Sequence, residues 1–407
     1  MALHTEQTRS AAAKSQLDQI RSRPLRVPSY PDSSKTDEPR EFSAASSPMR
    51  YLPELDGLRA IAVLLVITVH IPTMLFERLD GHLGVVIFFV LSGYLITSIA
   101  LREETNRGGL SLSAFCIRRM FRIFPLYYLT LGLYILLIIV LHFSPEKKIP
   151  LMHALPYYLT YLQEIPFFRY LQETTFLRDH TGQGLPFYQS WSLGIEEKFY
   201  LVWPVLCFSF LRYNRQLRIP LILLLTVACV FTSYTRPYII ILFGCLLALA
   251  LNSLRFRRSV QRIGQVGTWL SFGLLLVFQC TVMPRWDWRF ADHVYSIGFA
   301  VFLAFLLTGE SNLKRFLAKP LLIFIGKISY GIYLIHGFCI SAVRDKLHFG
   351  NSVPGFLLAC GLSIAIATAM HYLVEKPLIG VGRRLSAKFL YDKASHCDLA
   401  TPAEATK

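Results

Sequence analysis

The fold of this chain is decided by one apolar stretch, residues 58–70, which reads LRAIAVLLVITVH. It carries two ionisable side chains, Arg59 at its start and His70 at its end. In an α-helix eleven residue steps turn through about 1100°, which leaves two side chains within roughly 20° of one face. The same steps advance roughly 16 Å, about half the apolar thickness of a bilayer. Because ionisable groups inside a membrane are costly, the stretch predicts a membrane helix with a functional pair on one face. The alternative is a hydrogen-bonded histidine in a helix interface and an arginine at the membrane surface.

The composition is that of a membrane protein with several spans. Of 407 residues, 53% are hydrophobic and 14% aromatic, too apolar for a soluble protein of this length. The net charge of +16 comes from Lys and Arg gathered between apolar runs, where they set membrane topology. We therefore expect the lipid bilayer as a partner and no nucleic acid. The eight cysteines lack zinc-finger or CxxC spacing, so neither a metal site nor a disulfide framework is expected.

Apolar runs of spanning length recur along the chain and predict an all-α, polytopic transmembrane bundle of about ten spans. They lie at about 59–78, 84–101, 121–143, 190–211, 219–234, 237–252, 267–284, 293–308, 321–342 and 355–374. A further segment, Leu151 to Leu162, is rich in aromatic residues and too short to span, so it predicts one interfacial or re-entrant helix.

The basic residues between these runs predict the topology. If the chain crosses the membrane once at each of the ten predicted spans, the strongly basic loops all lie on one side of the membrane. The positive-inside rule identifies that side as cytoplasmic. These loops hold Arg102, Arg107, Arg118, Arg119 and Arg122; Arg212, Arg215 and Arg218; Arg255, Arg257, Arg258 and Arg262; Lys314, Arg315 and Lys319; and Arg383 and Arg384. Both termini are then cytoplasmic, Arg59 lies at the cytoplasmic end of its helix, and His70 lies near the bilayer midplane.

Composition also divides the chain into three parts. Residues 1–50 are polar and lack the apolar region of a signal peptide, so we expect a disordered cytoplasmic tail. Residues 51–385 form the expected membrane domain, and 386–407 form a polar C-terminal tail.

A second basic element lies on the same side as Arg59. Arg118 and Arg122 are four residues apart, a spacing that puts two guanidinium forks on one helical face, where they could grip neighbouring phosphates; Arg119 lies between them. The alternative is that these charges only set the topology.

Acidic and histidine candidates lie further along the chain. Glu196 and Glu197 follow the start of the 190–211 run, roughly 9–10 Å from its outer end, and at most one of them can face a given cavity. One of them could instead pair with Lys198. His336 falls in the outer half of the 321–342 run, where a packed, hydrogen-bonded histidine is the alternative to a catalytic one.

Small residues mark one helix for close packing. Gly84, Ser92 and Gly93 lie in an otherwise apolar run, where small side chains allow two helices to approach.

On these residues the chain resembles the acyltransferase family 3 membrane proteins, which include O-acetyltransferases of bacterial surface polysaccharides. The resemblance is carried by Asp56-Gly57-Leu58-Arg59-Ala60, the Arg59–His70 spacing, Phe88-Phe89-Val90-Leu91-Ser92-Gly93, Arg118–Arg122, Trp191-Ser192-Leu193, Glu196-Glu197, Phe199-Tyr200, Ser329-Tyr330, His336 and Glu375-Lys376-Pro377. These motifs run in order over residues 51–385. The family often has an acidic residue where this chain has Val86, a departure that weakens any role for that position and could signal a different acceptor.

The resemblance implies a membrane-bound acyltransferase, in a bacterial inner membrane, with no permanently bound cofactor. Acetyl-CoA or another acyl-CoA would be the donor from the cytoplasm, held by Arg59, Arg118, Arg119 and Arg122. The acceptor would be a hydroxyl of a surface glycan, glycolipid or related molecule. His70 would act as general base or as acyl carrier, with Glu196, Glu197 and His336 as further catalytic candidates. A transporter or flippase with a polar central pathway is the competing class, and a non-catalytic scaffold is a third.

Overall fold

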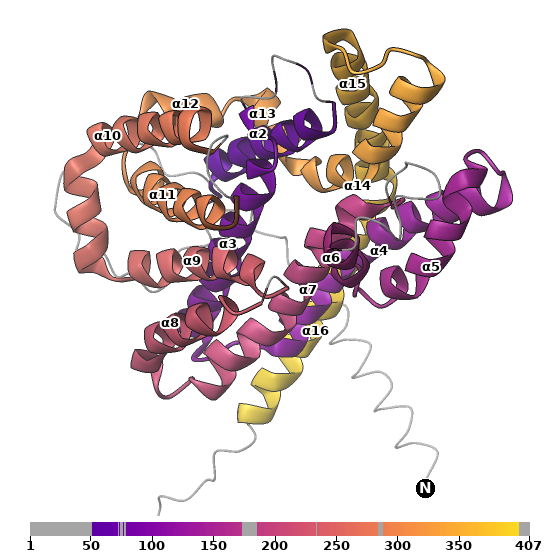
Figure 1. Cartoon of the computed structure of the whole chain (residues 1–407). Helices are drawn as coiled ribbons and strands as arrows, with labels where there is room; N and C mark the ends of the chain where they lie inside the picture. The colour runs from indigo at the N-terminus through magenta and orange to yellow at the C-terminus, as the bar shows by residue number, and fades with distance from the viewer. Residues whose placement is uncertain are drawn as a thin grey trace, which may run out of the picture. The chain divides into compact units, whose positions relative to one another are not determined.

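The computed structural model describes residues 51–71, 73, 76, 79–172, 185–232, 234–283 and 288–398. The chain divides into two units, 1–46 and 47–407, and the first lies outside the described residues, as does the whole tail predicted over 1–50. The described residues of the second unit form helices and no strands, which confirms the all-α prediction (Figure 1).

Several of the described helices continue into a π-helical turn at their C-terminal end. The bounds of the helices are α2 (Pro53–His70), α3 (Leu83–Arg107), α4 (Leu112–Ile135), α5 (Lys148–Leu159), α6 (Glu164–Gln172), α7 (Trp191–Pro204), α8 (Arg218–Cys229), α9 (Arg236–Asn252), α10 (Leu254–Val277), α11 (Trp288–Thr308), α12 (Asn312–Leu317), α13 (Pro320–Lys327), α14 (Ser329–Ser341), α15 (Val353–Met370) and α16 (Lys376–Asp398). The first part of the predicted C-terminal tail is therefore the end of α16, and 399–407 lie outside the described residues.

Several of these helices are membrane helices by length and composition. The candidate spans are Leu83–Arg107, Leu112–Val140, Leu254–Val282, Phe290–Thr308 and Val353–Phe389. A sixth arises if α13 and Ser329–Lys346, bent by 71°, count as one span. The predicted spans at 59–78, 190–211, 219–234 and 237–252 fall on α2, α7, α8 and α9, which are shorter or more charged. A helical membrane protein is confirmed, while the count of ten and the side of each terminus stay predictions.

Basic segments that the sequence predicts as loops are largely helical. Arg102 and Arg107 belong to α3, Arg118 to α4, and Arg255–Arg262 to the first part of α10, before its kink at Gly264. The loop prediction was wrong at these positions because arginine is a good helix former, so charge alone does not end a helix. Only a short turn, in which Gly108 has a φ of +69°, separates α3 from α4.

Close backbone contacts hold α2 and α3 in the core, where α2 packs on α3, α13 and α14, and α3 packs on α9 (Figure 1). A Cβ added to Gly84 would lie 2.3 Å from the Ala62 carbonyl oxygen of α2. One added to Gly93 would lie 2.0 Å from the Ile241 carbonyl oxygen of α9. The predicted packing role is therefore confirmed for Gly84 and Gly93.

A buried ion pair joins α3 to α8. Both side-chain nitrogens Nη1 and Nη2 of Arg218 donate to the Glu104 carboxylate, at 2.8 and 2.7 Å, and both residues are nearly inaccessible to solvent. The Arg218 guanidinium also lies over the Phe208 ring, 4.6 Å from its centroid. Arg218, which the sequence presents only as a topology charge, thus links two helices in the interior.

The short helix predicted at Leu151–Leu162 is present as α5. It leads through a turn into α6, which packs on α7, the helix that carries Glu196 and Glu197.

Candidate active site

Helix α2 carries Arg59 and His70 into different cavities. Arg59 donates from Nη1 to Asp56 Oδ1 at 3.1 Å and lines a small cavity of about 90 Å³. His70 is the last residue of α2 and lines two other cavities. The helix predicted from the sequence is therefore present, and Arg59 and His70 line separate cavities.

The first space, the arginine cavity, collects three guanidinium groups. Arg59 comes from α2, and Arg119 and Arg122 come from α4. Arg119 lies over the rings of Phe115 and Tyr200, at 5.6 and 5.3 Å from their centroids. The three guanidinium groups outnumber the two carboxylates, Glu196 and Glu197, that line the same cavity, so the arrangement favours an anionic occupant.

Arg118 is directed elsewhere. It donates to Glu103 Oε2 at 2.9 Å and does not line the arginine cavity. The structure therefore brings Arg119 and Arg122 to one cavity, in place of the Arg118 and Arg122 fork inferred from spacing. Arg118 and Arg122 are four residues apart on α4, but the residues packed around this helix give Arg118 an ion-pair partner, Glu103, and leave Arg122 at the cavity.

Glu196 and Glu197 line the same cavity as the arginines. Glu196 Oε2 accepts hydrogen bonds from Tyr200 Oη at 2.7 Å and from Ser92 Oγ at 3.1 Å. Ser92, which the sequence suggests as a packing residue, is thus a hydrogen-bond donor to the site. Both carboxylates line this one cavity beside the arginines, so the expectation that at most one of them faces a given cavity is wrong.

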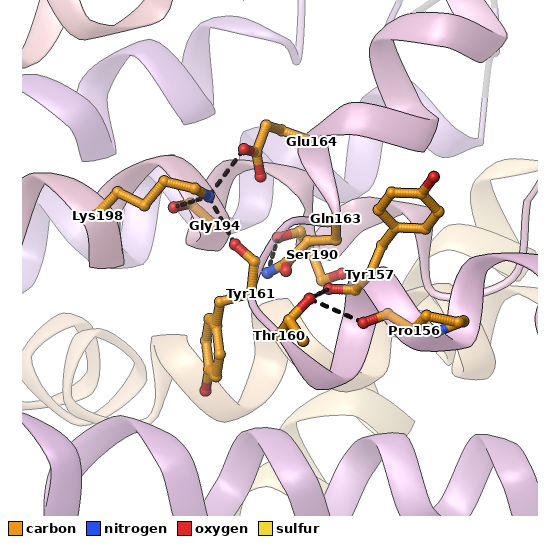
Figure 2. A network of polar contacts seen from close by, with 9 residues as sticks. All are labelled: Pro156, Tyr157, Thr160, Tyr161, Gln163, Glu164, Ser190, Gly194 and Lys198. Atoms are coloured by element: carbon orange, nitrogen blue, oxygen red, sulfur yellow. Dashed lines mark hydrogen bonds and ion pairs between the residues drawn. The ribbon is translucent and has the colours of Figure 1, made fainter.

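A polar network fixes the start of α7, the helix that carries both glutamates (Figure 2). Lys198 Nζ contacts Glu164 Oε1 at 2.8 Å and donates to the Tyr161 and Gly194 carbonyl oxygens at 2.6 and 2.9 Å. Gln163 Nε2 donates to the Ser190 carbonyl oxygen at 3.1 Å. Lys198 therefore pairs with Glu164 and binds the turn between α5 and α6 to α7.

The His70 ring is held in one orientation. Its Nδ1 lies 3.0 Å from the Val66 carbonyl oxygen, and its face stacks on the Tyr188 ring at 5.4 Å between centroids. A carbonyl oxygen can only accept, so Nδ1 carries the proton in the neutral ring. The other nitrogen, Nε2, then has a lone pair, which is what a general base needs.

The His336 ring packs against the His70 ring. It is fully buried in α14, its Nδ1 lies 2.6 Å from the Tyr333 carbonyl oxygen, and its ring meets His70 edge-on at 5.1 Å between centroids. It lines neither the arginine cavity nor the two cavities that His70 lines. The structure therefore brings the two predicted histidines together, with His70 alone of the two facing these cavities.

Two cavities meet at His70. The wide cavity, of about 820 Å³, has a charged rim with Glu146, Lys147, Arg344, Asp345 and Lys346. The aromatic cavity, of about 380 Å³, is walled by Phe89, Phe167, Phe168, Tyr188 and Trp191. Val86, where the resembling family often has an acidic residue, lines the aromatic cavity.

Tyr333 of α14 stands between the arginine cavity and the aromatic cavity and lines both. Its hydroxyl donates to the Gln189 carbonyl oxygen at 2.6 Å, and Ser192 Oγ lies 2.7 Å away. Sequence reasoning gave neither Tyr333 nor Tyr200 a role in the site, although it named Tyr200 within the Phe199-Tyr200 motif. Each lies within one turn of a candidate site residue: Tyr333 precedes His336 by three residues, and Tyr200 follows Glu196 by four.

The chain is similar in sequence to bacterial O-acetyltransferases. The chain is 29% identical over 379 residues to the O-acetyltransferase OatA of Staphylococcus aureus, covering 85% of this chain and 60% of that protein. It is 29% identical over 368 residues to a Bacillus subtilis protein, YrhL, provisionally named a peptidoglycan O-acetyltransferase, covering 82% and 56%. The chain thus spans about 56–60% of the length of these two relatives. No solved structure matches it.

A family model described as an acyltransferase domain, that of acyltransferase family 3, matches residues 52–372. That range contains α2 with Arg59 and His70, the α4 arginines, the α7 glutamates and His336. The chain is a membrane protein that belongs to acyltransferase family 3.

Proposed function

We propose that this protein transfers an acyl group, acetyl in the simplest case, from acyl-CoA to a hydroxyl of a carbohydrate-containing acceptor. One observation carries the proposal: helix α2 joins a cavity with three arginines to a histidine whose Nε2 lone pair is available at the junction of two further cavities.

The arginine cavity suits the phosphates of the donor. Guanidinium forks match phosphate oxygens in charge and geometry. The cavity is far too small for a whole nucleotide, so it would receive phosphate groups, with the adenosine outside. Arg59 and His70 are eleven residues apart, roughly 16 Å along the helix axis, and the pantetheine arm would cover this distance past Tyr333.

His70 would activate the acceptor. Its Nε2 takes the proton of the acceptor hydroxyl as that oxygen attacks the thioester carbonyl carbon. The tetrahedral intermediate collapses, the C–S bond breaks, and the proton passes from His70 to the departing thiolate. A positioned general base contributes about 10²–10⁴-fold. A covalent acyl-histidine is the rival route, and acyl label trapped on His70 in a single turnover would select it over direct transfer.

The relatives suggest the acceptor class. One is named for peptidoglycan O-acetylation, so we propose a glycan of the bacterial cell envelope as acceptor, with acetyl-CoA as the first donor to test. The competing transporter class gains no support from the family to which the chain belongs.

His70→Ala tests the assignment, with His142→Ala as the matched control. His142 Nδ1 also lies 3.0 Å from a carbonyl oxygen, that of Val140, yet His142 lines none of the three cavities. We expect His70→Ala to lower acyl transfer by at least about 100-fold with donor affinity unchanged, and His142→Ala to keep the wild-type rate. Near-normal turnover of purified His70→Ala protein would refute the proposal.

A further inference from the structure

One oxygen of a buried carboxylate at the aromatic cavity has no hydrogen-bond donor among the described residues. Asp292 of α11 lines this cavity together with His70 and is 6% exposed. Its Oδ2 lies 3.1 Å from His82 Nε2, but within the described part of the chain nothing hydrogen-bonds to Oδ1. An unsatisfied carboxylate oxygen is costly to bury, so the cavity calls for an occupant that brings a hydrogen-bond donor.

The aromatic side chains that line the cavity indicate what the rest of the occupant is like. Phe167 stacks on Trp191 with 4.6 Å between centroids and 4° between planes, and Phe168 meets Trp191 edge-on at 5.7 Å. Flat aromatic walls beside a buried carboxylate fit a molecule that has apolar faces and hydroxyl groups at its edges, which describes a pyranose ring. A plain hydrocarbon chain would leave Asp292 Oδ1 unsatisfied. The volume of about 380 Å³ lies within the usual range of small-ligand sites.

We propose that the aromatic cavity is the acceptor subsite and that Asp292, held by His82, positions a glycan by accepting a hydrogen bond from one of its hydroxyls. This inference rests on the proposed function, because His70 lines the same cavity and would act on another hydroxyl of the same ligand. Asp292 is a positioning residue: it makes and breaks no covalent bond.

The wide cavity supplies the matched control. Asp345 lines that cavity, which also reaches His70, and its carboxylate pairs with Arg344 at 2.7 Å. Asp345→Asn therefore makes the same chemical change as Asp292→Asn, but in the other space next to the histidine.

The experiment uses the full-length protein purified in detergent. Equilibrium dialysis gives the Kd of two radiolabelled probes, the N-acetylglucosamine–N-acetylmuramic acid disaccharide and maltose, and acyl-CoA hydrolysis is followed without acceptor. We expect Asp292→Ala to raise the Kd of at least one probe about tenfold or more and Asp292→Asn to raise it less, since the amide keeps one acceptor oxygen. Asp345→Asn should bind both probes with the wild-type Kd and should keep the wild-type rate of acyl-CoA hydrolysis without acceptor.

Three results would overturn the inference: unchanged binding in both Asp292 variants, a loss in Asp345→Asn without one in Asp292→Asn, or no binding of either probe to the wild type. If Asp292→Ala does not accumulate as folded protein, the near-isosteric Asp292→Asn decides alone. The proposed function fails separately, when His70→Ala retains transfer.

Discussion

Arg119→Ala tests whether the arginine cavity holds the donor. Arg119 is one of three guanidinium groups around that cavity, whereas Arg118, the adjacent residue of α4, pairs with Glu103 outside it. Two adjacent residues of the same type thus have different environments. The pair separates a ligand contact from a general effect of positive charge, which replacement of either arginine alone cannot do.

The expected magnitude follows from the contact that is lost. A hydrogen bond to a charged group contributes about 1.5–3 kcal/mol, which corresponds to a roughly 10- to 150-fold weaker affinity. Arg119→Ala also removes the contacts with Phe115 and Tyr200, worth about 0.5–2 kcal/mol, but it relieves repulsion with Arg59 and Arg122. We therefore expect a large loss of donor affinity and a smaller change in the stability of the unliganded protein.

Isothermal titration of coenzyme A into detergent-purified protein provides the assay. Arg118→Ala should leave the Kd unchanged and cost about 0–1 kcal/mol of stability, because its ion pair is partly exposed. Affinity of the wild type should fall as salt is raised, since the cavity is cationic. If Arg118→Ala weakens coenzyme A binding as much as Arg119→Ala does, the cavity is not the phosphate site and the arginines act only through overall charge.

Two further predictions concern packing and pH. Gly93→Ala would place a Cβ 2.0 Å from the Ile241 carbonyl oxygen and should destabilise the protein by about 1–3 kcal/mol. Gly132→Ala is the control, because nothing lies within 4 Å of its added Cβ, and it should be neutral or slightly stabilising. Equal melting temperatures of the two variants would contradict this packing account. Burial by itself would lower the pKa of His82, but the hydrogen bond and charge of Asp292, with the charge of Asp80, outweigh burial and raise this pKa. The His82–Asp292 pair therefore stabilises the fold fully below the ordinary histidine pKa of about 6.5. This stabilisation is lost as the pH rises through the raised pKa of His82. The difference in melting temperature between wild type and His82→Gln should therefore shrink from pH 5.5 to pH 9, and a constant difference would show that the pair does not contribute through its charge.

The helical membrane class could be read from the chain because it depends on local properties. Apolar runs of spanning length indicate membrane helices. The helix repeat alone predicts that Arg59 and His70, eleven residues apart, lie on one face of their helix. Gly84 and Gly93 likewise indicate a close helix contact by their size. Span count was harder, because α2 and α7 carry charged residues and α13 and α14 meet at a bend of 71°.

The site depends on which helix faces which, and spacing along one helix cannot supply that. The sequence placed Glu196 and Glu197 far from Arg59, yet α7 lies beside α3 and brings them to the arginine cavity. It paired Arg118 with Arg122 by their spacing, but Arg118 pairs with Glu103 and it is Arg119 that lines the cavity with Arg122.

The amino-acid sequence by itself thus determined the helices, the apolar surroundings and the presence of an arginine and a histidine on one helix face, because these follow from periodicity and hydrophobicity. Only the tertiary structure decided that His336 supports His70, that Tyr333 separates two cavities, and that Asp292 of α11 shares a cavity with His70 of α2. The physical reason is distance along the chain: His70 and Asp292 lie more than two hundred residues apart, and only the packing of several helices against one another makes them neighbours.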